Sequence, residues 1–243
     1  MNTAIVTGAS RGFGRAIAAA LTATGTDVIG VARTNDLLEE VRRELGAAFT
    51  PVVADAADPA TAASLIAQYR PSTVVLAAGA APPMLSLLDQ TWDTFSTNWN
   101  VDVAQAFHWS RQALRRPLAP GSTVIALSSG AALAGSPLSG GYAGAKATVK
   151  FITSYAAEES DRAGLGIGFV SVLPRLTPVT ELGAQAVAAY AERQGVDVDA
   201  FKQAAGPALT AEQVGKSILD IAAGGPGRHG AYLLTASGAS ALN

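Results

Sequence analysis

The chain has 243 residues, of which 49% are hydrophobic and 15% charged, and its formal net charge at pH 7 is −2. So high an apolar share with so few charges excludes an intrinsically disordered chain. With no cysteine and only two histidines, His108 and His229, the sequence excludes disulfides, thiolate chemistry and a metal centre built from several histidines. The slightly negative charge, without a run of lysine or arginine, argues against nucleic acid as a partner.

The first ten residues, MNTAIVTGAS, lack the basic segment and the long apolar stretch of a signal peptide. The longest apolar runs, such as residues 74–78, are much shorter than the roughly 20 residues that a membrane-spanning helix needs. We therefore expect a soluble, cytoplasmic protein without a membrane partner. Its length suits one α/β domain that covers residues 1–243.

Short apolar runs alternate with helical stretches from one end of the chain to the other. The runs predict strands at residues 4–7, 27–32, 51–54, 73–77, 122–127, 166–173 and 231–234. Helical spacing of apolar residues predicts helices at residues 13–23, 37–45, 90–116, 142–163, 184–194 and 211–222, and a short helix that begins at residue 59. Asn35 and Asp58 are the predicted N-caps of two of these helices. Strands that are apolar on both faces and alternate with helices predict an α/β, doubly wound Rossmann fold with a seven-stranded parallel sheet and helices on both faces.

A glycine-rich loop joins the first predicted strand to the first predicted helix. Glycines let the backbone approach a pyrophosphate, and the free N–H groups at the start of a helix face its charge. Glycine clusters also serve ordinary turns, but this one has the strand before it and the helix after it that the dinucleotide motif requires. The predicted cofactor-binding residues of the loop are Gly8, Ser10, Arg11, Gly12, Phe13 and Gly14.

The end of the second predicted strand indicates which nicotinamide cofactor the loop suits. An acidic residue at this point binds the ribose 2′-hydroxyl of NAD(H), whereas an arginine accommodates the 2′-phosphate of NADP(H). This sequence has Arg33 there, and Arg11 in the glycine loop is a second guanidinium for the same phosphate. The two arginines favour NADP(H) over NAD(H); the alternative is that both are solvated surface residues.

Tyr142 and Lys146 stand four residues apart near the start of a predicted helix, so both side chains project from one face. An ammonium beside a tyrosine stabilises the phenolate, which prepares the hydroxyl for general acid or base chemistry near neutral pH. Ser129 follows the fifth predicted strand, where its hydroxyl can hydrogen-bond a substrate oxygen. A tyrosine and a lysine at this spacing are common on protein surfaces, so the strand-end serine and the glycine loop make the site hypothesis specific.

In this order and at this spacing, the motifs resemble those of the short-chain dehydrogenase/reductase family over essentially the whole chain. The matching residues are the loop at residues 7–14, Asp55, Ala78, Gly79, Ser129, Tyr142 and Lys146. The resemblance implies an oxidoreductase in which Tyr142 gives or takes the hydroxyl proton, Lys146 binds the nicotinamide ribose and Ser129 orients the substrate oxygen. It also implies that Asp55 and Ala56 meet the adenine. The substrate that we expect is a small or medium-sized ketone or the corresponding secondary alcohol.

The sequence departs from the family's pattern at two positions that precede Tyr142 in the chain. Ala77 stands where the family has an asparagine after the fourth strand. The asparagine that kinks the family's long helix and holds a relay water falls at Asp102, with Asn98 and Asn100 as neighbouring candidates. The resemblance therefore implies a catalytic role for Asp102, and an aspartate there implies an altered water chain or pH response.

A third departure follows the sixth predicted strand, where Arg175 replaces the glycine that the family has after its proline. The arginine either pairs with an anionic group of the substrate or points into solvent. By the resemblance, Pro174 and a following threonine meet the nicotinamide. Thr177 is the predicted residue and Thr180 the alternative.

The resemblance also implies a lid and an oligomer. Residues 177–206 correspond to the variable segment over the substrate, and Leu182, Val187, Tyr190 and Phe201 predict a partly apolar pocket. Three tryptophans lie in or beside the long predicted helix, more than the core-facing side of one helix can bury. In the resembled family, this helix and the helix that carries the tyrosine form a subunit interface. Large aromatic residues are enriched in such interfaces, so we expect a homodimer or homotetramer.

Two other functions stay open from the sequence alone. The departures at Ala77, Asp102 and Arg175 are compatible with a nucleotide-binding regulatory protein that does not catalyse a reaction. The same fold also supports epimerisation or dehydration, because a fold does not by itself choose a chemistry.

Overall fold

The computed structural model describes residues 2–224 and 229–242 and contains an eight-stranded sheet. The seven predicted strands are present and run parallel, in the spatial order β3-β2-β1-β4-β5-β6-β7. They are β1 (Thr3–Thr7), β2 (Asp27–Ala32), β3 (Phe49–Val53), β4 (Thr73–Leu76), β5 (Thr123–Leu127), β6 (Gly168–Pro174) and β7 (His229–Thr235). The predicted α/β Rossmann fold is thereby confirmed.

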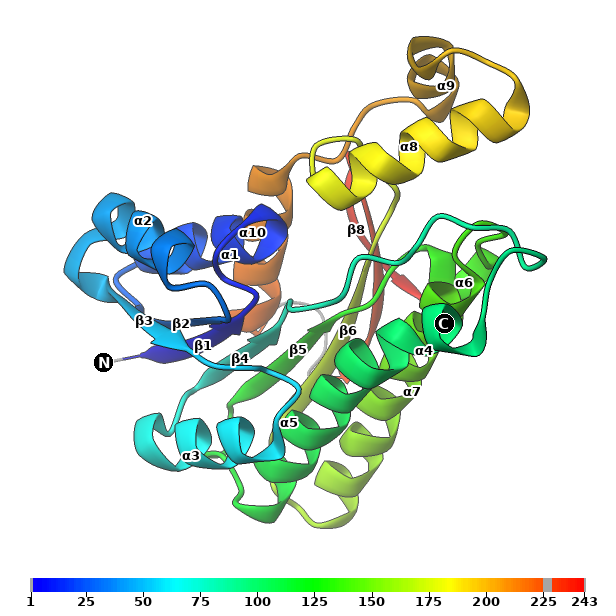
Figure 1. The fold of residues 1–243 in the computed structure, drawn as a ribbon. Helices are drawn as coiled ribbons and strands as arrows, with labels where there is room; N and C mark the ends of the chain where they lie inside the picture. Colours follow the sequence, from blue (N-terminus) through cyan, green and yellow to red (C-terminus); the bar gives the residue numbers. More distant parts are fainter. Residues whose placement is uncertain (1, 225–228, 243) are drawn as a thin grey trace.

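Helices cover both faces of this sheet (Figure 1). They are α1 (Gly12–Ala23), α2 (Asn35–Leu45), α3 (Pro59–Tyr69), α4 (Trp92–Asn98), α5 (Ala104–Arg115), α6 (Ala131–Ala134), α7 (Gly140–Arg162), α8 (Glu181–Gln194), α9 (Val198–Ala205) and α10 (Ala211–Ala222). One core packs α1, α2 and α10 on one face, with Ile17 and Ile218 fully buried. A second core packs α3, α5 and α7 on the other face, around the fully buried Trp109. None of the helices in the described part of the chain combines the length and hydropathy needed to cross a bilayer.

The sheet ends in a strand that the sequence pattern does not predict. Strand β8 (Gly238–Leu242) pairs antiparallel with β7, and most of its residues are exposed. Because these small residues show no apolar alternation, backbone pairing across a tight turn holds the strand. Gly238 opens β8 with a φ of +111°, a conformation that side chains disfavour.

The long helix predicted at residues 90–116 is interrupted in the structure. A π-helical turn, Trp99–Val103, separates α4 from α5. Such turns are rare and occur frequently at functional sites, because the wider turn changes the direction of the side chains that it carries.

One of the two predicted helix caps is wrong. Asp58 accepts a hydrogen bond from the backbone N–H of Ala60 at the start of α3, as predicted. Asn35, however, is the first residue of α2, and the residue before it, Thr34, makes no capping hydrogen bond with its side chain. The extended backbone at Thr34 places the helix boundary one residue earlier than expected.

The order of the strands determines where a ligand can bind. Strands β2 and β3 lie on one side of β1, and β4 lies on its other side, so the direction of strand addition reverses at β1. In such sheets, ligands bind in the crevice outside the carboxyl ends of the strands at this reversal. The loops that carry the predicted site residues follow β1 to β6 and therefore meet at this end of the sheet.

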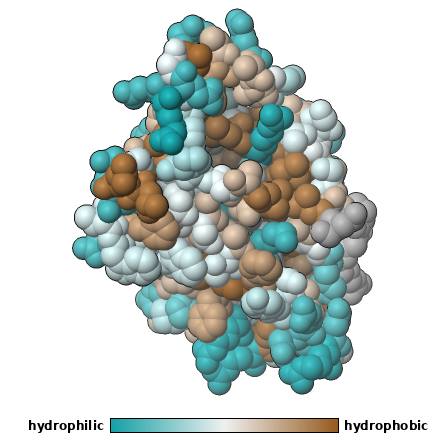
Figure 2. Space-filling model, turned by 90° about the vertical axis from the view of Figure 1, so that its right-hand side faces the viewer, coloured by the Kyte–Doolittle hydropathy of each residue, from teal (hydrophilic) through white to brown (hydrophobic). Residues whose placement is uncertain are grey.

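Helices α8 and α9 stand apart at the carboxyl ends of the strands, at the upper right of Figure 1. Both lie within the lid predicted at residues 177–206. Leu182, Tyr190 and Phe201 line the main cavity, whereas the buried Val187 lines a smaller neighbouring cavity that also includes Phe201. In Figure 2, hydrophobic residues gather on the surface below the projecting top of the molecule, which α8 and α9 form.

Candidate active site

A cavity of about 1130 Å³ opens along the carboxyl ends of the parallel strands. Its wall includes the loops after β1 to β6 and the first turns of α1 and α8. All the residues predicted for catalysis or cofactor binding lie in this wall, although they come from distant parts of the chain. They are Gly8, Ser10, Arg11, Gly12, Phe13, Gly14, Arg33, Asp55, Ala56, Ala78, Gly79, Asp102, Ser129, Tyr142, Lys146, Pro174 and Thr177.

The loop between β1 and α1 presents its backbone to the cavity. Gly8 and Gly12 have φ values of +66° and +54°, in the left-handed region that favours glycine. A Cβ on Gly14 would lie 2.1 Å from the carbonyl oxygen of Gly8, so only glycine allows this close approach. Helix α1 has neither an acidic residue in its first turn nor a side-chain cap. The loop therefore fits the pyrophosphate of a dinucleotide, which needs close backbone approach and unpaired helical N–H groups.

Two arginines and an aspartate lie along the rim of the same half of the cavity. Arg33 is exposed in the wall, and β2 ends before it without an acidic residue. The Nη1 atom of Arg11 lies 2.6 Å from Oε2 of Glu181, the first residue of α8, so this arginine is paired with the lid. Asp55 is exposed and accepts a hydrogen bond from the backbone N–H of Ala57.

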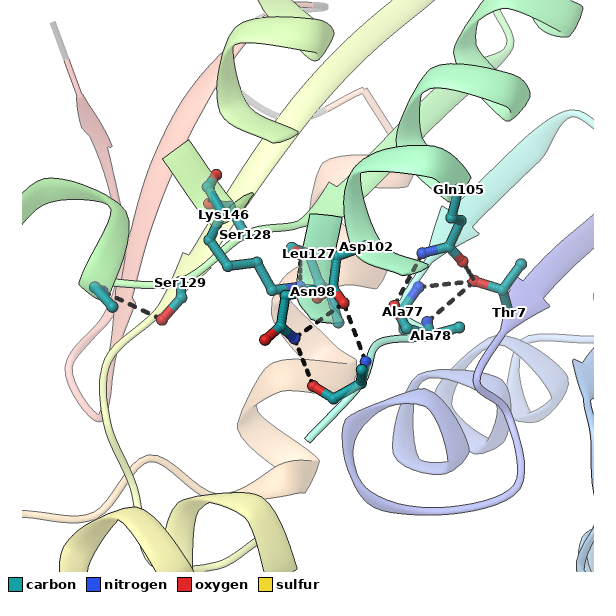
Figure 3. A network of polar contacts seen from close by, with 12 residues as sticks. Thr7, Ala77, Ala78, Asn98, Asp102, Gln105, Leu127, Ser128, Ser129 and Lys146 are labelled. Atoms are coloured by element: carbon teal, nitrogen blue, oxygen red, sulfur yellow. Dashed lines mark hydrogen bonds and ion pairs between the residues drawn. The ribbon is translucent and has the colours of Figure 1, made fainter. Parts of the chain in front are cut away.

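A hydrogen-bonded brace holds the loop after β4 (Figure 3). The buried hydroxyl of Thr7 accepts hydrogen bonds from the backbone N–H groups of Ala77, at 3.0 Å, and Ala78, at 3.2 Å. The side chain of Gln105 accepts a hydrogen bond from Thr7 and donates one, of 2.9 Å, to the carbonyl of Ala78. The loop is thereby held without the asparagine that the resembled family has at position 77.

Asp102 lies on the π-helical turn, and only 1% of its surface is exposed. Its Oδ2 accepts hydrogen bonds from the backbone N–H of Ala80, at 3.0 Å, and from Nδ2 of Asn98, at 3.2 Å. Its Oδ1 lies 2.8 Å from Nζ of Lys146. Gly79 approaches the carboxylate so closely that a Cβ there would lie 2.9 Å from Oδ1. The aspartate is thus held between the loop after β4 and the lysine of α7.

Lys146 is buried beside Tyr142 on α7. Its Nζ donates a 2.9 Å hydrogen bond to the carbonyl of Leu127 at the end of β5, and lies 5.7 Å from the centre of the Tyr142 ring. Burial by itself lowers the pKa of an ammonium, but the carboxylate of Asp102 and, after it, Tyr142 outweigh this effect and raise the pKa of Lys146 above its usual value. Ser128 donates a 2.7 Å hydrogen bond to the carbonyl of Lys146, which anchors this turn of α7 to β5.

Ser129 and Tyr142 are half-buried in the cavity wall. The hydroxyl of Ser129 accepts a hydrogen bond of 3.2 Å from the backbone N–H of Ala131 and retains its own proton for a further bond. In the part of the chain that the structure describes, no hydrogen bond occupies the hydroxyl of Tyr142. Chemically, the two side chains offer a general acid or base and a second hydroxyl for one oxygen of a bound molecule.

The loops after β5 and β6 are joined at the cavity wall. The carbonyl of Pro174 accepts a 2.9 Å hydrogen bond from the N–H of Gly130, next to Ser129. Arg175 follows, exposed in the wall, and its guanidinium has no partner among the residues described. An unpaired cation therefore lies on the side of the cavity that carries Ser129.

The two candidate threonines both use their hydroxyls within the protein. Thr177 is buried and donates a 2.7 Å hydrogen bond to the carbonyl of Leu209. Thr180 accepts a hydrogen bond from the N–H of Gly183 and caps α8. Both residues line the cavity, Thr177 at the start of the lid segment and Thr180 at its first helix.

Sequence reasoning missed three polar residues that hold this site. Gln105 and Ser128 were not expected in it, and Asn98 was expected only as a substitute for Asp102. A signal for two of them exists, because Asn98, Asp102 and Gln105 follow one another at spacings of four and three, which places polar side chains on one helical face. Asn100 lies off this face and is exposed, so it is not part of the site.

Comparisons with known proteins agree with this geometry. The model of the family described as short chain dehydrogenase matches residues 2–191. An uncharacterized short-chain type dehydrogenase/reductase of Sinorhizobium fredii is 31% identical over 173 residues, which cover 70% of this chain and 68% of the relative. The 3-oxoacyl-(acyl-carrier-protein) reductase FabG of Escherichia coli is 30% identical over 178 residues, which cover 69% and 71%.

A relative of lower coverage and a solved structure of lower identity are also described as a reductase and as a short chain dehydrogenase/reductase. The L-xylulose reductase of Cavia porcellus is 29% identical over 118 residues, which cover 49% of this chain and 48% of the relative. A solved structure described as a short chain dehydrogenase/reductase family protein superposes with a TM-score of 0.74 over 96% of this chain and 94% of its own, at 24% identity. At that identity, the structural likeness shows the fold alone.

Proposed function

This chain is a member of the short chain dehydrogenase family, and from that premise we propose that it is an NADPH-dependent reductase that acts on ketones, or on the corresponding secondary alcohols in reverse. The observation that carries the proposal is the meeting of Ser129, Tyr142 and Lys146 in the cavity that the glycine loop borders. Neither a surface Tyr-Lys pair nor an ordinary glycine turn explains why these groups share one wall.

The proposed chemistry divides among three side chains. A bound nicotinamide supplies or accepts the hydride. In reduction, the hydroxyl of Tyr142 donates its proton to the substrate oxygen, which Ser129 holds by a hydrogen bond. The ammonium of Lys146, near the ring of Tyr142, stabilises the phenolate that remains. In the oxidation of an alcohol, the phenolate takes the proton back.

The proposed cofactor position uses the remaining wall residues. The glycine loop holds the pyrophosphate, Asp55 and Ala56 meet the adenine, and Pro174 and Thr177 meet the nicotinamide, as the resemblance implies. Arg33 and Arg11 hold the 2′-phosphate. Two observations support NADP(H): β2 ends without an acidic residue, and Arg33 has no ion-pair partner in the described residues.

The pairing of Arg11 with Glu181 does not oppose this assignment. Both side chains are largely exposed, at 69% and 67%, and exposed ion pairs contribute only about 0–1 kcal/mol. Arginine binds phosphate through two charge-assisted hydrogen bonds, which are stronger. We therefore expect Arg11 to exchange the carboxylate for the 2′-phosphate.

We also propose a homodimer or homotetramer. Phe107 on α5 and Phe151 and Tyr155 on α7 expose 49%, 52% and 59% of their surfaces. Large exposed aromatic residues on adjacent helices are typical of subunit interfaces. Light scattering after size-exclusion chromatography tests this point, and a monomer at micromolar concentration would contradict it.

The first experiment is a titration with NADPH and NADH, followed by nicotinamide fluorescence, and then a ketone panel on the same sample. The panel spans neutral ketones, 3-oxoacyl thioesters, which the name of the Escherichia coli relative suggests, and ketones with a carboxylate that Arg175 could bind. We expect NADPH to bind at least about tenfold more tightly than NADH, since charged hydrogen bonds contribute about 1.5–3 kcal/mol. We also expect at least one ketone to consume NADPH.

Each other outcome contradicts part of the proposal. Binding without consumption of any ketone would favour the non-catalytic regulatory alternative or another chemistry. Absence of binding would remove the dinucleotide site. The matched control is Tyr142→Phe, which we expect to retain the NADPH affinity and to lower turnover by about 10²–10⁴-fold, the usual contribution of a general acid. Unchanged turnover would remove Tyr142 from the mechanism.

A further inference from the structure

The lysine of the proposed active site has a negative partner inside the protein. The ammonium of Lys146 and the carboxylate of Asp102 lie 2.8 Å apart, and their side chains are 8% and 1% exposed. In Figure 3, the side chains of Lys146, Asn98 and Asp102 meet beside the loop after β4. The lysine charge is therefore paired before any molecule enters the cavity.

The carboxylate is held firmly in this place. Its Oδ2 is occupied by the backbone N–H of Ala80 and by Asn98, whose Nδ2 also donates to the carbonyl of Ala80 at 2.7 Å. Gly79 closes the remaining side, since a Cβ there would lie 2.9 Å from Oδ1. A carboxylate with these neighbours cannot rotate away from the lysine without losing two hydrogen bonds.

Few other charges act on this pair. On α7, Tyr142 is the group besides Asp102 that acts on the charge of Lys146. The loops after β4 and β5 contribute backbone groups and the serines at 128 and 129. Their one charged side chain, Asp89, is exposed and lies outside the cavity wall. The loop after β6 carries Arg175. Its Cα would lie 3.6 Å from a Cβ atom added to Gly130. That guanidinium is exposed and therefore well screened.

The pairing of Lys146 with Asp102 changes the electrostatic potential at Tyr142. A lone ammonium near the ring favours the phenolate and releases the hydroxyl proton at lower pH. A carboxylate at 2.8 Å from that ammonium opposes this effect, because it offsets part of the positive charge that the phenolate faces. The positive charge near Tyr142 is therefore smaller than that of an unpaired lysine.

We propose that Asp102 is a positioning residue that offsets the charge of Lys146, so that Tyr142 keeps its proton to higher pH and the site favours carbonyl reduction over alcohol oxidation. The part of this inference that concerns reaction direction rests on the proposed function; the part that concerns the proton on Tyr142 does not. Reduction needs the protonated hydroxyl and oxidation needs the phenolate, so one charge biases both directions in opposite senses.

The decisive variant is Asp102→Asn, which keeps the size and an oxygen for the N–H of Ala80 but removes the negative charge. Its first test uses the protein without cofactor and follows tyrosinate formation by ultraviolet absorbance as the pH rises. Subtracting the same titration of Tyr142→Phe, in each background, isolates Tyr142 from the other tyrosines. We expect the midpoint of Tyr142 to fall by about one pH unit or more in Asp102→Asn, the usual effect of a nearby charge. An unchanged or higher midpoint would overturn the proposal.

The second test is the pH dependence of kcat. In Asp102→Asn, we expect the alkaline limb of ketone reduction and the acid limb of alcohol oxidation both to move to lower pH by the same amount as the midpoint. A purely structural role would lower kcat at all pH values and move neither limb. The control is Asp93→Asn, an exposed position in the first turn of α4 that does not line the cavity, and it should leave both limbs in place.

The two proposals fail separately. A shifted midpoint without reduction of any ketone would leave the charge offset intact and remove the proposed function. Reduction of a ketone with an unmoved midpoint and unmoved limbs would remove the charge offset alone. If Asp102→Asn does not fold, Asp102→Ser removes the same charge with a smaller side chain, and the same titration decides.

Discussion

Two ion pairs of similar length lie in the wall of one cavity and differ in their exposure to water. Lys146 and Asp102 are 2.8 Å apart with 8% and 1% of their side chains exposed, whereas Arg11 and Glu181 are 2.6 Å apart with 69% and 67% exposed. Water screens the exposed pair, which joins the glycine loop to the lid, and makes it easy to exchange. The buried pair cannot lose one partner without leaving an unpaired charge in the interior. Burial therefore decides what each pair does. The buried pair of Lys146 and Asp102 controls the charge near Tyr142, whereas the exposed pair of Arg11 and Glu181 is a contact that a ligand can replace.

Removing one partner of the buried pair should have the largest effect. Asp102→Leu leaves the ammonium of Lys146 buried and unpaired, and we expect the free energy of unfolding to fall by about 3–5 kcal/mol in urea denaturation. The double variant Asp102→Leu/Lys146→Met should recover most of this loss, because apolar residues can replace a buried pair at little cost. Glu181→Leu is the matched change in the exposed pair, with an expected loss of about 0–1 kcal/mol. Equal losses at the two sites would contradict the comparison.

The buried pair should also show in the pH dependence of stability. The pKa of Lys146 is raised in the folded protein, after burial, Asp102 and Tyr142 are taken together. The folded state then holds this proton more tightly than the unfolded state, so the contribution is complete below the ordinary lysine pKa of about 10.4 and is lost as pH rises through the raised value. We expect the free energy of unfolding to fall more steeply above about pH 10.4 in the wild type than in the double variant. If the free energy of unfolding falls equally steeply with pH in the two proteins, the buried pair is not the cause of the alkaline loss of stability.

A third prediction concerns the rim beside the glycine loop. Arg33→Asp should weaken NADPH binding by about ten- to a hundredfold, since charged hydrogen bonds contribute about 1.5–3 kcal/mol, and should change NADH binding little. Titration of both cofactors on one preparation measures the ratio. Arg193→Asp, which changes the same charge in the last turn of α8 outside the cavity wall, is the control. A loss of the same size for both cofactors would remove the 2′-phosphate assignment.

The smallest expected effect belongs to the exposed pair. Glu181→Gln frees Arg11 from the lid, so NADPH should bind up to about fivefold more tightly, the value of an exposed ion pair, with a smaller change for NADH. The same fluorescence titration measures it. Weaker NADPH binding would mean that Glu181 orients Arg11 for the cofactor and does not compete with the 2′-phosphate for this arginine.

Local features of the fold and site were predictable from the sequence, because neighbouring residues determine them. The glycine loop follows from its strand–loop–helix context, and the shared face of Tyr142 and Lys146 follows from their helical spacing. Strand β8 could not be predicted, since its small exposed residues carry no pattern and only pairing with β7 makes it a strand. The apolar pattern alone predicts one long helix at residues 90–116, whereas the family resemblance implies a kink near Asp102, and the structure has a π-helical turn there.

The sequence by itself determined the fold class, the chemistry that the cavity wall can offer and the positions that depart from the family. Periodicity, glycine loops and residue types are local properties, and they survive in a one-dimensional pattern. Only the tertiary structure decided that Asp102 meets Lys146, that Gln105 and Thr7 brace the loop after β4, and that Arg11 pairs with the lid. These contacts join residues far apart in the chain, and their energies depend on burial, which packing of the two helical layers against the sheet creates.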